Sequence, residues 1–116
     1  MSMESLPVIL RTYDLYKAVV EITHHCKKQW RYSLGQNLEH SILDMLSELI
    51  MAKNAPKLLK AGYLIKAGAH QETIMFKLRL LLELKIANET NIFKAQELSA
   101  EIGRMLGGWR KSVLSS

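Results

Sequence analysis

The 116-residue sequence has little of what cross-links or interrupts a chain: one cysteine, two prolines and six glycines. The single cysteine, Cys26, excludes a disulfide within the chain and favours a reducing compartment. No apolar run reaches the roughly 18 residues that a membrane-spanning helix needs. The first residues also lack the charged-then-apolar plan of a secretory signal. We therefore expect a cytoplasmic protein with no membrane association.

Motifs that carry catalysis or bind metals are also missing. The sequence contains no glycine-rich phosphate loop and no GxGxxG pattern. His24, His25 and Cys26 are adjacent, and neighbours on a helix point about 100° apart, so they are poorly placed to form one tetrahedral metal site. His40 and His70 stand apart from any metal-binding motif. We predict no catalytic residues, no metal and no cofactor, and therefore no enzymatic activity.

Apolar residues at helical spacing, by contrast, are abundant, and hydrophobic residues make up 48% of the chain. Four segments show this spacing: Pro7 to about Lys28, Ser33 to about Ala55, Lys57 to about Ala87, and a last one that starts near Ile92. Four amphipathic helices with short connections predict an all-α fold. We expect an antiparallel up-down-up-down four-helix bundle that forms a single domain over residues 1–116.

Local signals support these helix boundaries. Residues 29–32 are expected to form a short connection, after which Ser33 and Gln36 have the spacing of a capping box. Residues 88–91 form a polar break before the last helix. The third helix carries two apolar rows. One contains Leu58, Gly62, Ile65, Ala69, Phe76 and Leu80, and the other Leu64, Gly68, Met75, Leu78 and Leu82.

The net charge is +5, from 16 lysines and arginines against 11 acids, and it is unevenly placed. Residues 56–87 carry six bases and two acids. Cations at helical spacing can line a phosphate backbone, although lysines also simply keep a bundle soluble. We predict that binding of nucleic acid or a protein partner involves Lys53, Lys57, Lys60, Lys66, Lys77, Arg79 and Lys85.

The segment from residue 103 to residue 111 has an unusual composition, with three glycines within six residues. Each glycine costs a helix about 1 kcal/mol relative to alanine, so a compensating contact is expected. A subunit interface would supply that contact, and tryptophan and arginine are enriched at interfaces. The predicted interface contains Gly103, Arg104, Gly107, Trp109 and Arg110. The alternative is that Trp109 is buried within its own bundle.

Three segments carry a family resemblance: RTYDLYK at 11–17, WRYSLGQ at 30–36 and EIGRMLGGW at 101–109. They resemble the accessory variability determinant proteins of diversity-generating retroelements, and the resemblance covers nearly the whole chain. The third segment is the most diagnostic. The second is shared with a wider group of four-helix-bundle proteins, which includes those encoded in ribosomal RNA intervening sequences.

The resemblance implies a four-helix-bundle protomer that assembles into a positively charged, five-membered ring. Such proteins bind the reverse transcriptase of the element and nucleic acid, RNA or DNA, and support error-prone RNA-templated cDNA synthesis without a catalytic site of their own. The alternative is a scaffold protein of the intervening-sequence type with no reverse-transcriptase partner. A reverse-transcriptase gene beside this one would favour the first interpretation.

Overall fold

Helices account for nearly all of the residues that the structure describes, 5–115. In this computed structural model they are α1 (Ser5–His24), α2 (Lys28–Trp30), α3 (Gln36–Asn54), α4 (Lys57–Glu83) and α5 (Glu89–Ser115), with a π-helical turn, η1 (Arg31–Gly35), before α3. No strand occurs within residues 5–115, and the all-α prediction is confirmed. The first four residues, which bear on the expectation about a secretory signal, and Ser116 lie outside the described residues.

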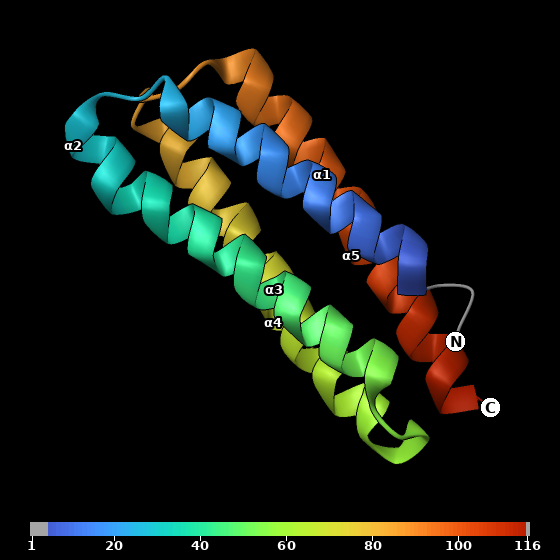
Figure 1. Cartoon of the computed structure of the whole chain (residues 1–116). Coiled ribbons are helices and arrows are strands. Elements are labelled where there is room, and N and C mark those ends of the chain that lie inside the picture. The colour runs from blue at the N-terminus through green and yellow to red at the C-terminus, as the bar shows by residue number, and fades with distance from the viewer. Residues whose placement is uncertain (1–4, 116) are drawn as a thin grey trace.

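The four long helices pack side by side in a body of 47 × 21 × 18 Å (Figure 1). The main contacts join α3 to α1 and α4, and α5 to α1 and α4, so α1 and α4 occupy opposite corners. Figure 1 shows the start of α1, the turn between α3 and α4, and the end of α5 towards one end of the bundle, which we call the terminal end. The helix α2 and the connection from α4 to α5 lie at the other end, the α2 end.

A continuous apolar core runs along the bundle between these helices. Its fully buried side chains recur every three or four residues, as on α3, where Leu38, Ile42, Met45 and Leu49 are inaccessible to solvent. Burial of each such side chain contributes roughly 1.5–3 kcal/mol. The buried Thr12 hydroxyl donates to the Val8 carbonyl (2.9 Å), so this polar group is satisfied inside the core. Periodic burial therefore holds the four helices together.

The connection between α1 and α3 differs from its prediction. α1 ends at His24, and residues 29–32, expected to be a loop, are helical. The predicted capping box is wrong because the backbone N–H of Gln36 already donates to the Arg31 carbonyl within the π-helical turn. The Ser33 hydroxyl instead donates to the Gln29 carbonyl (2.7 Å). A side chain has no free N–H to cap where the backbone is already helical.

At the next polar break, the structure agrees with the sequence. The Asn88 side-chain oxygen accepts a hydrogen bond from the backbone N–H of Asn91 (3.0 Å), which satisfies one of the free donors at the start of α5. α4 ends at Glu83, four residues before the predicted end.

The two apolar rows of α4 lie on roughly opposite sides of the helix. Leu64 and Leu78, from the second row, are buried in the core. Leu58 and Phe76, from the first row, are 95% and 70% exposed. Positions two residues apart differ by about 200° around a helix, so the two rows cannot both face the core.

Candidate nucleic-acid interface

The charge of the protein is concentrated towards the terminal end of the bundle. Residues 49–71, which form the end of α3 and the first half of α4, contain no aspartate or glutamate, and neither do residues 102–115 of α5. Together these segments carry seven cations. We call this set the basic end: Lys53, Lys57, Lys60, Lys66, Arg104, Arg110 and Lys111.

Packing between α4 and α5 brings the two acid-free segments together. The Gln71 side-chain amide on α4 donates to the Ser99 carbonyl on α5 (2.9 Å). A Cβ atom added at Gly103 would lie only 3.1 Å from the Gln71 amide, so glycine lets the helices approach closely there. Towards the terminal end, Ile65 and Arg110 line the same groove between α4 and α5. The two segments that carry these cations therefore lie side by side, and Glu72 lines the same groove as Arg110.

One of these lysines has a structural role. The Lys60 ammonium donates to the carbonyls of Ala52 (2.8 Å) and Lys53 (3.0 Å), which lie in the last turn of α3. Those carbonyls have no helical N–H partner, and a cation there also complements the helix dipole. Lys60 therefore closes α3 while it adds to the positive field of the basic end.

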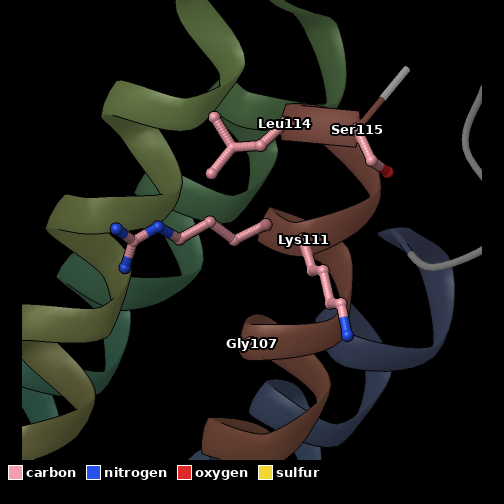
Figure 2. A pocket seen from close by; sticks show the side chains of 5 residues that line it. Gly107, Lys111, Leu114 and Ser115 are labelled. Atoms are coloured by element: carbon pink, nitrogen blue, oxygen red, sulfur yellow. The ribbon is translucent and has the colours of Figure 1, made fainter.

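The other exposed cations of the basic end are available to a ligand. None of them forms an ion pair with an acid among residues 5–115, and they are Lys57, Lys66, Arg104, Arg110 and Lys111. The Lys66 ammonium lies 5.7 Å from the centre of the Tyr63 ring. Figure 2 shows Lys111 and Leu114 leaving the end of α5 in different directions, beside Gly107 and Ser115. Unpaired cations on one surface suit a flexible polyanion such as single-stranded nucleic acid.

Three of the seven predicted cations lie elsewhere. The Lys77 ammonium donates to the Ser41 hydroxyl on α3, and Arg79 forms an exposed ion pair with Glu83 (3.7 Å). Lys85 follows the end of α4 and lies at the α2 end. The structure therefore brings together Lys53, Lys57, Lys60 and Lys66 and leaves Lys77, Arg79 and Lys85 apart from them.

One protein-family model matches nearly the whole chain. The model described as bAvd-like matches residues 8–113, which is more than nine-tenths of the sequence. The chain belongs to the bAvd-like family. This confirms the resemblance to accessory variability determinant proteins. A search of curated proteins found no match to this bAvd-like chain.

The residues of the bAvd-like protein that are predicted to form a subunit interface differ in burial. Trp109 is fully buried in the protomer's own core, which corrects its interpretation as an anchor for another subunit. Gly103 is half-buried against Gln71. Gly107 is exposed, as are Arg104 and Arg110, which belong to the basic end and whose predicted place in a subunit interface stays a prediction. The absence of acids in 49–71 and 102–115 is the sequence signal that places these two arginines in the basic end.

Other chemical groups of the bAvd-like protein lie outside the basic end. Burial raises the pKa of the Cys26 thiol, and nearby Arg31 partly opposes that effect. Among residues 5–115, no three histidine, cysteine, aspartate or glutamate side chains are close enough to share a metal ion. Within the same range, no helix is both long and apolar enough to cross a membrane.

A smaller basic pocket lies at the α2 end. It is lined by Lys27, Trp30, Leu84, Lys85 and Ile86, from the two connections at that end. The backbone N–H groups of Lys85 and Ile86 donate to the carbonyls of Leu82 and Leu81, which closes the end of α4. This geometry places Lys85 at a φ of 56°, a left-handed conformation that glycine usually occupies at a helix end. Glu83 at the end of α4 and Glu89 at the start of α5 flank this connection in the sequence, whereas the segments of the basic end contain no acid.

Proposed function

We propose that this bAvd-like protein is a non-catalytic accessory protein of a diversity-generating retroelement. In this proposal the chain is a single antiparallel up-down-up-down domain. It assembles into a basic ring of five copies, binds the reverse transcriptase and nucleic acid in the cytoplasm, and supports mutagenic RNA-templated cDNA synthesis. The observation that carries the proposal is the family match over residues 8–113.

The basic end supplies a physical basis for the nucleic-acid part of this function. The seven cations of the basic end, which lie in two sequence segments without aspartate or glutamate, would attract an RNA or cDNA strand and release counterions from its phosphates. In a ring with protomers aligned about one axis, the basic ends would form one continuous positive face. Such a face binds without reading bases, because phosphate contacts carry no sequence information.

Binding of both nucleic acid and reverse transcriptase would raise the local concentration of template at the polymerase. Linking two binding events in this way increases occupancy without any new chemistry on the accessory protein. The accessory role therefore needs a rigid scaffold and a charged surface, and the bundle offers both.

Co-expression with the reverse transcriptase of the proposed element tests the proposal. We expect the two proteins to purify together, light scattering to give a multimer of the accessory protein, and affinity for single-stranded RNA to fall steeply with salt. A protein that is monomeric and binds neither RNA at low salt nor the polymerase would contradict the proposal. A multimer that lacks both partners would instead fit the scaffold proteins of ribosomal intervening sequences.

A further inference from the structure

The side of α4 that faces away from the core is apolar. Leu58, Ile65, Ala69, Phe76 and Leu80 recur along this side, and we call them the α4 outer row. All five are exposed, Leu58 and Phe76 most of all. The outer side of a surface helix is normally polar, and a helix that is apolar on both sides is normally buried on both. An extended apolar row of this kind marks an interaction surface.

α1 carries a second row of the same kind. Leu6, Leu10, Tyr13 and Val20 are exposed on the side opposite the buried Leu15, and we call them the α1 outer row. Because α1 and α4 occupy opposite corners of the bundle, the two rows point in different directions. One protomer therefore cannot cover either row with the other.

A charge lies in or beside each row, and the two charges are opposite. Lys17 lies between Tyr13 and Val20 on α1, and Glu72 lies at the edge of the α4 row between Ala69 and Phe76. Both side chains are exposed. Glu72 has no ion-pair partner among residues 5–115. Arg79 lies on the same edge of α4 as Glu72, and it is paired with Glu83 (3.7 Å). The Lys17 ammonium lies 3.6 Å from Asp14 and 5.0 Å from the centre of the Tyr13 ring, which leaves room for a further acid.

We propose that the two rows are the halves of one repeating head-to-tail contact between copies of this chain. The α4 outer row of one copy packs against the α1 outer row of the next, and Lys17 meets Glu72 across the contact. The inference rests on the proposed oligomer and names the surfaces that build it. A symmetric contact between two α4 rows would leave both α1 rows uncovered, whereas the head-to-tail contact covers both rows and gives a ring when the rotation between copies closes.

Two variants of the full chain test the direction of the contact. Leu10→Asp damages only the α1 row, and Phe76→Asp damages only the α4 row. We expect each variant alone to be monomeric by light scattering. An equimolar mixture should form a dimer and nothing larger, because one intact α4 row meets one intact α1 row. Phe93→Asp is the matched control: Phe93 is 51% exposed on α5 and belongs to neither row, so this variant should keep the wild-type mass.

A charge exchange tests the pairing within the contact. Lys17→Glu and Glu72→Lys should each weaken self-association about tenfold by placing like charges together, and the double variant should recover most of the loss. Circular dichroism of every variant checks that the bundle remains folded, which is expected because all five positions are exposed.

The outcomes separate this contact from the proposed function. A dimer of Leu10→Asp alone would show a symmetric α4 contact and overturn the inference, as would a mixture that stays monomeric. A wild-type ring whose mass none of these variants changes would reject the contact and leave the accessory function intact. A wild-type monomer would contradict both the ring and the contact. Co-purification with the reverse transcriptase would then test the rest of the proposed function separately.

Discussion

The neighbouring helices α4 and α5 each have 27 residues, yet their outer faces differ in kind. The outer face of α5 carries Lys94, Glu97, Arg104 and Lys111, which suit contact with water or a charged ligand. The outer face of α4 carries leucine, isoleucine and phenylalanine. In α5 most apolar positions lie on the buried side, with Phe93 and Leu114 as exposed exceptions, whereas α4 carries a complete second apolar row. The second apolar side of α4 is the surface that the proposed contact with a neighbouring copy would cover.

The largest effect should come from the buried side of α5. Trp109→Ala should lower the free energy of unfolding by about 3–5 kcal/mol, because a fully buried indole leaves a large cavity. Phe93→Ala, a change on the exposed side of the same helix, should cost less than about 1 kcal/mol. Urea unfolding measures both. Equal losses would break the distinction between the two sides of α5.

Substitutions on the two sides of α4 are expected to change different properties of the protein. Leu78→Ala should destabilise the protomer by about 2–5 kcal/mol, because Leu78 is fully buried in the core. Phe76→Ala should leave the unfolding of dissociated protomers almost unchanged and weaken self-association instead. Urea unfolding at low concentration and light scattering at high concentration distinguish these losses. A protomer stability that depends strongly on Phe76 would contradict an outer row built for assembly.

The cations at the end of α5 are expected to determine how RNA binding depends on salt concentration. Arg110→Gln combined with Lys111→Gln should reduce the salt dependence of RNA binding by a slope of about 1.4, roughly 0.7 for each lost phosphate contact. The control Arg79→Gln with Lys94→Gln removes the same charge from outside the basic end and should change the slope much less. Fluorescence anisotropy at several salt concentrations measures the slope. Equal changes would mean that net charge, and not the basic end, determines binding.

Two glycines of α5 give a smaller contrast. Gly107→Ala should stabilise the protein by about 0.5–1 kcal/mol, because the site is open and alanine favours the helix. Gly103→Ala should be about 1–2 kcal/mol less stable than Gly107→Ala, since its Cβ displaces Gln71 from Ser99. Thermal unfolding compares the two variants. Similar stability would show that Gln71 moves aside at no cost.

The smallest effect is expected at the end of α4. Lys85→Gly should stabilise the bundle by about 0.5–1 kcal/mol, because glycine adopts the left-handed φ at this position without steric cost. Lys85→Ala keeps the steric cost and serves as the control. If Lys85→Ala stabilised the bundle as much as Lys85→Gly in the same thermal assay, the destabilising effect would come from the charge of Lys85 and not from its left-handed φ.

Much of the fold was predictable from sequence because helical periodicity reports burial directly. The all-α class, the polar break at Asn88 and the start of α4 at Lys57 followed from local signals. The connection around Ser33 was mispredicted because the residues with capping-box spacing lie in a π-helical turn, where the backbone N–H of Gln36 is already hydrogen-bonded. The candidate site was only partly predictable: spacing along α4 grouped Lys66 with Lys77, but the partners of each lysine lie on other helices.

Sequence alone determined which residues repeat at helical spacing, where acids are absent, and which family the chain resembles, because each of these properties is local or cumulative along the chain. Tertiary structure decided which apolar row of α4 faces the core and that Trp109 belongs to the protomer. It also decided that the end of α5 lies beside the first half of α4, at the same end of the bundle. These outcomes depend on which helices become neighbours, and that choice is made by packing between segments far apart in the chain.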